Sequence, residues 1–310
     1  MIILQFPGQG SQAVGMGAAL ASEFPVAKAV FAEVDEALGQ CLSKTMFEGP
    51  IEVLTLTENA QPAIMASSIA LIRVFETEFG FDVAKAGYVC GHSLGEYTAL
   101  TAARAFTLPD AANLLKLRGQ AMQRAVKAGE GAMASLIGPK VDIALAEAAA
   151  IEGAKHGVCV VANDNNNGNV VISGEKAAVD AATLAAKAMG ARAIPLAVSA
   201  PFHCPLMAPA AVEMQAALAD VAMQAPIVPI VPNISLAPTD DVEEIKKLLV
   251  EQVTGRVRWR ETVEMFGRMG VNKFVEIGSS SVLTGMSKRI FADAMHVSIC
   301  SVEDMRNFGD

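Results

Sequence analysis

A glycine-flanked serine in the first third of the chain has the surroundings of a nucleophile. Gly91-His92-Ser93-Leu94-Gly95 matches Gly-x-Ser-x-Gly and stands between an apolar run of strand length and a segment of small residues. A sharp turn from strand to helix would project the Ser93 hydroxyl. The Leu94 backbone N–H would then lie at a helix N-terminus, where a developing oxyanion is stabilised. The alternative is an ordinary turn in which Ser93 only caps the helix.

A general base for such a serine is sought among the four histidines, at positions 92, 156, 203 and 296. His203 is the strongest candidate, because it stands where the chain is expected to return to the main sheet and can meet Ser93. The alternative is a hydrogen-bonded histidine at a domain junction. We expect His92 to have a structural role, since its side chain leaves the turn in another direction. No acidic residue between Ser93 and His203 stands out as a triad acid, so a main-chain carbonyl is the candidate to orient the imidazole.

A second glycine-rich loop, Pro7-Gly8-Gln9-Gly10-Ser11-Gln12, follows the first apolar run. The dinucleotide pattern Gly-x-Gly-x-x-Gly fails here, and no phosphate-binding lysine is present. Such a loop can also bring a backbone N–H close to a reacting carbonyl, which makes Gln9 the candidate second oxyanion donor. A simple turn is the alternative.

The elements that must position these residues alternate along the chain. Apolar runs typical of strands occupy residues 2–6, 87–90, 132–137, 158–162, 170–173, 193–198, 227–232, 273–277 and 296–299. Helical segments are predicted at 25–38, 61–79, 95–103, 109–128, 141–151, 176–189, 209–221, 242–253 and 259–269. This alternation predicts an α/β protein with a mainly parallel sheet.

One stretch has a different rhythm. From about residue 131 to 198 the order is β-α-β-β-α-β, which is typical of ferredoxin-like domains. Between its middle strands, Asn163–Asn169 is a turn by composition. We therefore predict a large domain of residues 1–128 and 199–310 and an inserted small domain of residues 129–198.

Composition excludes several classes of protein. The 24 basic and 33 acidic residues give a net charge of −9, which argues against a general nucleic-acid binder. A hydrophobic content of 52% with 18% charged residues excludes disorder. The five cysteines are widely spaced without a C-x-x-C pair, so neither disulfides nor a metal site is expected. We expect no signal peptide and no membrane span, and hence a cytoplasmic protein.

Together these motifs resemble the malonyl-CoA:acyl carrier protein transacylases, over essentially the whole chain. The resemblance rests on Phe6-Pro7-Gly8-Gln9-Gly10-Ser11-Gln12, Gln61-Pro62-Ala63, Gly91-His92-Ser93-Leu94-Gly95-Glu96-Tyr97, Arg118-Gly119, Phe202-His203, Glu251-Gln252-Val253 and Phe274-Val275-Glu276-Ile277-Gly278. It implies an α/β-hydrolase-like large domain with a ferredoxin-like (βαββαβ) insertion.

The resemblance also implies roles for single residues. Ser93 would be the acylated nucleophile, His203 its base, and Gln252 the residue whose main-chain carbonyl orients that histidine. Gln9 and Leu94 would supply the oxyanion N–H groups. Substrate-binding roles fall on Arg118 for the malonyl carboxylate, on Phe202 for selection against methylmalonyl, and on Gln9 and Asn163. Asn167 and Asn169 stand where the family has Pro and Gln in the predicted turn, a departure that bears on the details of this turn and on the contact from Asn163 to the substrate arm.

The implied activity is transfer of a malonyl group from malonyl-CoA to the phosphopantetheine thiol of acyl carrier protein through an acyl-serine, supplying fatty acid synthesis. No cofactor or metal is implied, and we expect a monomer. A serine thioesterase or hydrolase, or an acyltransferase of malonate decarboxylation, stays open as the alternative. The chain has a net charge of −9, and both CoA and the carrier are anionic. Their attraction to this protein must therefore come from a local group of basic residues, since salt screens more distant charges. The best candidate for a basic docking edge is Arg256-Val257-Arg258-Trp259-Arg260, with Lys288, Arg289 and Lys116 as possible additions.

Overall fold

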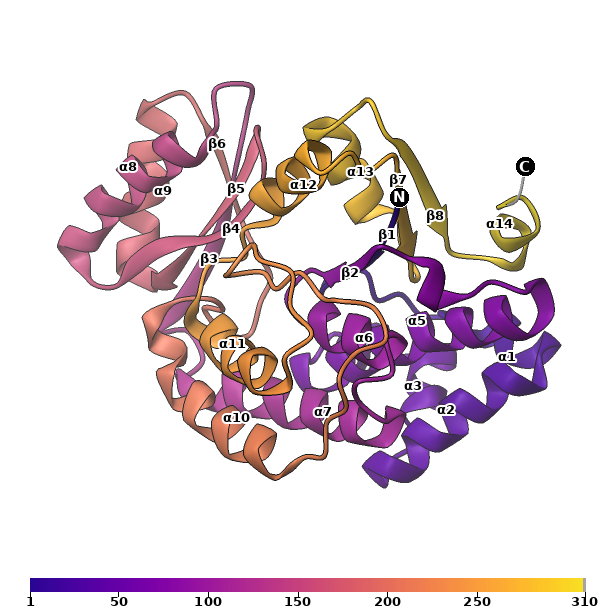
Figure 1. The fold of residues 1–310 in the computed structure, drawn as a ribbon. Helices are drawn as coiled ribbons and strands as arrows, with labels where there is room; N and C mark the ends of the chain where they lie inside the picture. The colour runs from indigo at the N-terminus through magenta and orange to yellow at the C-terminus, as the bar shows by residue number, and fades with distance from the viewer. Residues whose placement is uncertain (309–310) are drawn as a thin grey trace.

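A fully parallel four-stranded sheet forms the centre of the molecule (Figure 1). The computed structural model describes residues 1–308. In sheet order the strands are β2 (Tyr88–Gly91), β1 (Ile2–Phe6), β7 (Lys273–Ile277) and β8 (Met295–Ile299). Four consecutive residues are buried in both β1 and β7, as expected for parallel strands covered on both faces. The predicted α/β class is confirmed.

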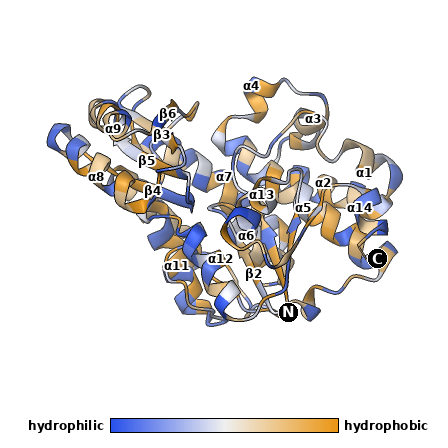
Figure 2. Ribbon diagram, turned by 90° about the horizontal axis from the view of Figure 1, so that it is seen from above, coloured by the Kyte–Doolittle hydropathy of each residue, from blue (hydrophilic) through white to orange (hydrophobic). Residues whose placement is uncertain are grey.

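Helices cover this sheet and supply most of the core. They are α1 (Ala18–Glu23), α2 (Pro25–Leu38), α3 (Leu42–Glu48), α4 (Ile51–Leu54), α5 (Thr57–Phe79), α6 (Gly95–Ala102), α7 (Leu108–Ala125), α10 (Ala208–Asp220), α11 (Val242–Thr254), α12 (Trp259–Arg268), α13 (Val282–Ile290) and α14 (Val302–Arg306). The helix α5 is buried along most of its length, whereas α11 carries both hydrophilic and hydrophobic residues (Figure 2), as expected for a helix with one buried face. Within residues 1–308 no helix is long and apolar enough to cross a membrane.

A second, antiparallel sheet lies to one side, with strand order β4-β5-β3-β6. Its elements along the chain are β3 (Gly131–Ile137), α8 (Ile143–Gly153), β4 (Cys159–Asn166), β5 (Asn169–Glu175), α9 (Lys176–Ala188) and β6 (Arg192–Pro195). In Figure 1 the two helices lie on the outer side of this sheet, and between them and the sheet is a separate hydrophobic core. The other face of the sheet is therefore turned toward the rest of the molecule.

The asparagine-rich segment predicted as a turn is mostly strand. The strand β4 continues to Asn166 and β5 begins at Asn169, which leaves a two-residue turn. Long-range contacts override the turn propensity of this segment. The Asp164 N–H donates to the Val257 carbonyl (2.9 Å), and the buried Asp164 carboxylate accepts three hydrogen bonds from Arg260.

The predicted strand at 227–232 is also wrong. Only single bridges form there, from Ile230 to Val89 and to Thr239. Prolines at positions 226, 229 and 232 remove the N–H donors that a ladder needs. The helices α1, α3, α4, α13 and α14 are present although periodicity did not predict them.

Candidate active site

Ser93 occupies a tight turn between β2 and α6. Its φ is 54°, in the left-handed region that non-glycine residues rarely adopt. Two close backbone approaches shape the turn. A Cβ on Gly91 would lie 2.0 Å from the Gly95 backbone, and a Cβ on Gly95 would lie 2.2 Å from the Phe6 carbonyl oxygen. Only glycine fits at these two positions, so the sequence motif dictates the turn that projects Ser93.

His203 lies against this serine, although 110 positions separate the two residues. The Ser93 Oγ is 2.8 Å from His203 Nε2, while Nδ1 is 2.9 Å from the Gln252 carbonyl oxygen and 3.1 Å from that of Gly255. Nδ1 must carry the proton to donate to a carbonyl, which leaves Nε2 as an acceptor. Burial and the nearby Arg118 charge lower the pKa of His203 to about 3. The imidazole is therefore neutral near pH 7 and can accept the Ser93 proton.

Arg118, on α7, places a buried cation beside the same hydroxyl. Its Nη1 donates to Gln61 Oε1 (2.8 Å), and its Nη2 donates to Gln252 Oε1 (2.9 Å) and to Ser93 Oγ (3.1 Å). Only 1% of its surface is exposed. A buried guanidinium with fixed partners can bind a carboxylate through parallel hydrogen bonds, a geometry that lysine cannot reproduce.

These groups open into a cavity of about 360 Å³. Its polar lining includes Gln9, Ser93, Arg118, Asn163 and His203. Its apolar lining includes Met122, Met133, Val171, Leu196, Val198 and Phe202. The lining comes from the loops after β1 and β2, from α5, α7 and α13, and from β3, β4 and β5, so the cavity lies between the large body and the face of the antiparallel sheet that α8 and α9 leave open.

The cavity also contains two backbone donors. Gln9 and Leu94 line it, and neither N–H is hydrogen-bonded to another residue of the described chain. Unsatisfied N–H groups beside a nucleophile can stabilise an oxyanion. The site therefore combines a serine, a neutral imidazole, a cation and backbone donors, which is a set suited to acyl transfer.

Comparison with known proteins identifies the family of this site. Residues 5–306 match the acyl transferase domain. The malonyl CoA-acyl carrier protein transacylase of Escherichia coli K12 is 43% identical over 286 residues, covering 92% of this chain and 91% of that protein. Its Bacillus subtilis 168 counterpart is 42% identical, covering 93% and 90%. The chain belongs to the malonyl-CoA:acyl carrier protein transacylase family.

Solved structures of transacylases agree with the whole fold. An acyl-carrier-protein S-malonyltransferase from Bartonella henselae is 52% identical, with a TM-score of 0.96 over 99% of this chain and 98% of that one. Another, 41% identical with a TM-score of 0.94 and coverage of 99% and 98%, is a malonyl-transacylase in complex with a type II polyketide acyl-carrier protein.

Two predicted residues of the transacylase site lie at its edge. Phe202 is buried and lines the cavity beside His203. Asn163 also lines it, with Nδ2 3.4 Å from His92 Nε2. His92 itself hydrogen-bonds to Asn165 Oδ1 (3.0 Å), so it joins the serine turn to β4, in line with a structural role.

Sequence reasoning missed two buried polar residues next to the nucleophile. The Glu96 carboxyl group accepts from the Asn233 N–H and from Gln252 Nε2. Burial raises the pKa of Glu96 to about 8. Glu96 could have been suspected from its place at the end of the serine motif, whereas nothing near Asn233 in the sequence marks it.

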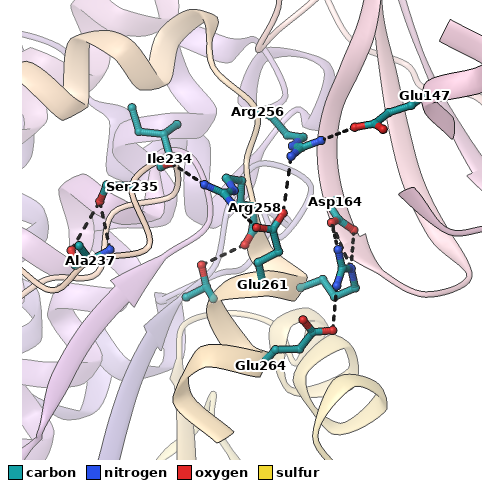
Figure 3. Close-up of polar contacts among 11 residues, drawn as sticks. Glu147, Asp164, Ile234, Ser235, Ala237, Arg256, Arg258, Glu261 and Glu264 are labelled. Atoms are coloured by element: carbon teal, nitrogen blue, oxygen red, sulfur yellow. Dashed lines mark hydrogen bonds and ion pairs between the residues drawn. The ribbon is translucent and has the colours of Figure 1, made fainter. Parts of the chain in front are cut away.

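The predicted basic docking edge at residues 256–260 is internally neutralised (Figure 3). Its ion pairs are Arg256 with Glu147 (2.9 Å) and Glu261 (3.5 Å), Arg258 with Glu261, and Arg260 with Asp164 (2.8 Å) and Glu264 (2.8 Å). Three cations thus meet four carboxylates from α8, β4 and α12. The pairs with Glu147 and Asp164 join this segment to α8 and to the antiparallel sheet, and the seven paired side chains carry no positive excess.

The other docking candidates differ among themselves. Lys116 is engaged by Gln40 Oε1 (2.9 Å) and Asn59 Oδ1 (3.0 Å). Lys288 and Arg289 are exposed at the end of α13 and form no ion pair with any residue in 1–308. The same helix contributes Val282, Leu283 and Met286 to the cavity lining.

Proposed function

We propose that this chain transfers a malonyl group from malonyl-CoA to the phosphopantetheine thiol of acyl carrier protein, supplying fatty acid synthesis. The observation that carries the proposal is the position of one hydroxyl. Ser93 Oγ lies 2.8 Å from His203 Nε2 and 3.1 Å from Arg118 Nη2 in a single cavity. Activation of the serine and recognition of a substrate carboxylate therefore occur at the same place.

In the first step, Ser93 Oγ attacks the thioester carbonyl carbon and His203 Nε2 takes its proton. The carbonyl oxygen becomes an oxyanion that accepts from the Gln9 and Leu94 N–H groups. The C–S bond then breaks, and the CoA sulfur leaves with the proton from His203. Arg118 binds the malonyl carboxylate throughout.

In the second step, the carrier thiol attacks the malonyl-Ser93 ester. His203 accepts the thiol proton and returns it to Ser93 Oγ as the C–O bond breaks. These steps use only side chains and backbone groups, so the proposal includes no cofactor. Phe202 narrows the cavity beside the acyl group and disfavours an added methyl, a difference worth about 10–200-fold. Asn163 is proposed to contact the substrate arm.

We also propose an α/β-hydrolase-like catalytic domain of residues 1–128 and 199–310, with a ferredoxin-like domain of residues 129–198 inserted. In support, the inserted elements follow the order β3-α8-β4-β5-α9-β6, and all neighbouring strands are antiparallel. The insertion also has its own core. The chain is proposed to act as a cytoplasmic monomer.

The carrier is proposed to dock near Lys288 and Arg289. Their exposure on α13, whose other residues line the cavity, supports this placement. Charge reversal at both positions should raise KM for the carrier with little change in KM for malonyl-CoA, and the effect should weaken at high salt. Reversal at Lys28 is the matched control, because this exposed lysine lies on α2, which contributes no residue to the cavity lining. An unchanged KM for the carrier would reject this docking site.

The central test is a loading assay followed by intact mass spectrometry. Mixing the protein with malonyl-CoA should add one malonyl group to Ser93, and added carrier protein should remove it as malonyl-carrier. Ser93→Ala is the control for the modified position. Release of free malonate without a carrier would favour the hydrolase alternative, and absence of any adduct would reject both enzyme functions.

A further inference from the structure

We propose that Asn233 is a positioning residue that sets the nucleophile turn and reserves the Leu94 N–H for the oxyanion. The proposal deepens the acyl-transfer function and rests on it. Asn233 follows the irregular segment around Ile230 and is 140 positions from Ser93. Its side chain hydrogen-bonds to the turn, and only 1% of Asn233 is exposed.

The side-chain amide of Asn233 links Gly91 and Ser93, the residues on either side of His92 in the turn. Its Oδ1 accepts the Ser93 N–H (2.7 Å), and its Nδ2 donates to the Gly91 carbonyl (2.6 Å). The backbone of Asn233 is itself held, because its N–H donates to Glu96 and its carbonyl accepts from the Arg258 N–H (3.1 Å). The amide is thus fixed before it contacts the turn.

The effect of Asn233 on the oxyanion donor follows from the acceptors of the backbone N–H groups of residues 92–96. Four of the five have acceptors: His92 to Phe6 (3.0 Å), Ser93 to Asn233 (2.7 Å), Gly95 to His92 (2.9 Å) and Glu96 to Ser93 (3.0 Å). The Leu94 N–H alone has no acceptor among the described residues. No backbone carbonyl of residues 1–308 accepts the Ser93 N–H, and Asn233 Oδ1 accepts it instead. Of the donors at residues 92–96, only the Leu94 N–H is therefore left for the oxyanion.

Asn233 also stabilises an unfavourable conformation. Ser93 has a φ of 54°, and a residue held in such a region costs about 1–3 kcal/mol unless its surroundings enforce it. Without the amide, the Ser93 N–H and the Gly91 carbonyl would be buried without partners, and the turn would relax. The Ser93 hydroxyl and the Leu94 N–H would then lose their mutual alignment. Arg118 is held by other residues, so malonyl binding would be retained.

The test compares Asn233→Leu, which removes both hydrogen bonds at similar volume, with Asn233→Asp, which keeps the acceptor and loses the donor. Asn59→Leu is the matched control, because Asn59 is buried and hydrogen-bonded away from the serine turn. Two rates are measured per folded molecule: malonylation of Ser93 in a single turnover, and phosphonylation of Ser93 by a fluorophosphonate. The second reaction needs the nucleophile and the oxyanion donors but no malonyl recognition.

We expect Asn233→Leu to slow both reactions about 100-fold, the size of an oxyanion-donor loss, with KM for malonyl-CoA nearly unchanged. Asn233→Asp should lose less, and Asn59→Leu should lower the melting temperature without slowing either reaction. Wild-type rates in Asn233→Leu would overturn the proposal; if that variant does not fold, wild-type rates in Asn233→Asp would do so. If the wild-type enzyme is phosphonylated but never malonylated, the proposed substrate is wrong. Slower phosphonylation of the Asn233 variants would in that case still support the positioning role of Asn233.

Discussion

Replacing Arg118 by alanine should remove the preference for malonyl over acetyl groups. The guanidinium can form two charge-assisted hydrogen bonds to the substrate carboxylate, each worth about 1.5–3 kcal/mol. Their loss corresponds to at least ~10²-fold in kcat/KM for malonyl-CoA, since 1.4 kcal/mol is a factor of ten. Acetyl-CoA has no carboxylate and should lose much less. From the acetyl reaction the substitution removes the 3.1 Å contact between Arg118 Nη2 and Ser93 Oγ but no contact with a substrate carboxylate.

The same substitution should change the pH profile. Burial first, and the Arg118 charge second, lower the pKa of His203 to about 3. A general base acts above its pKa, so the wild-type rate should show no acid limb near neutral pH. Removing the guanidinium takes away one cause, so the pKa of His203 rises. The acid limb of acetyl loading then moves to higher pH than in the wild type.

The assay measures kcat/KM for malonyl-CoA and acetyl-CoA between pH 3 and 8, a range that contains the expected acid limb, with Arg124→Ala as the control. Arg124 lies on the same helix, is 56% exposed and pairs with Glu213 at the surface. The control should keep both the wild-type ratio of the two substrates and the wild-type profile. A wild-type ratio in Arg118→Ala would refute the carboxylate role, and an unshifted profile would refute the coupling to His203.

Three further outcomes follow from the packing and the charges. Gly95→Ala should destabilise the fold by about 1–3 kcal/mol in urea unfolding, because the new Cβ would lie 2.2 Å from the Phe6 carbonyl oxygen. Asp164→Asn should cost about 3 kcal/mol by the same measurement, since it leaves the Arg260 guanidinium without its buried carboxylate. His203 is protonated below about pH 6.5 in the unfolded chain but stays neutral in the folded one, so its contribution to stability falls as the pH drops from 6.5 toward 3. His203→Gln should therefore reduce the acid sensitivity of the urea midpoint.

Local signals in the sequence were sufficient for several elements of the parallel sheet and its helices. The strand at 2–6 and the strand at 273–277 have the predicted bounds, because each is an apolar run with clear ends. The helix at 25–38 begins at a proline and ends before a glycine, as predicted. The turn at Ser93 was also predictable, since Gly91 and Gly95 leave room for the close backbone approaches that this turn requires.

Long-range contacts account for what the sequence could not predict. Composition favours a turn at Asn163–Asn169, but Asp164 is held by Arg260 from 96 positions away. The arginines near position 256 look basic in the chain, yet two of the carboxylates that neutralise them come from α8 and from β4 of the antiparallel sheet. The contact between Asn233 and Ser93 is equally distant in sequence and has no local signature.

The absence of a triad acid has a physical explanation in this geometry. A carboxylate beside His203 would raise the imidazole pKa and would compete with the substrate for the Arg118 cation. The Gln252 carbonyl orients the imidazole without adding a charge, and the side chain of the same residue hydrogen-bonds to both Arg118 and Glu96. Because burial raises the pKa of Glu96 to about 8, this nearby carboxyl group is largely neutral at pH 7. The site thereby keeps one cation available for one substrate carboxylate.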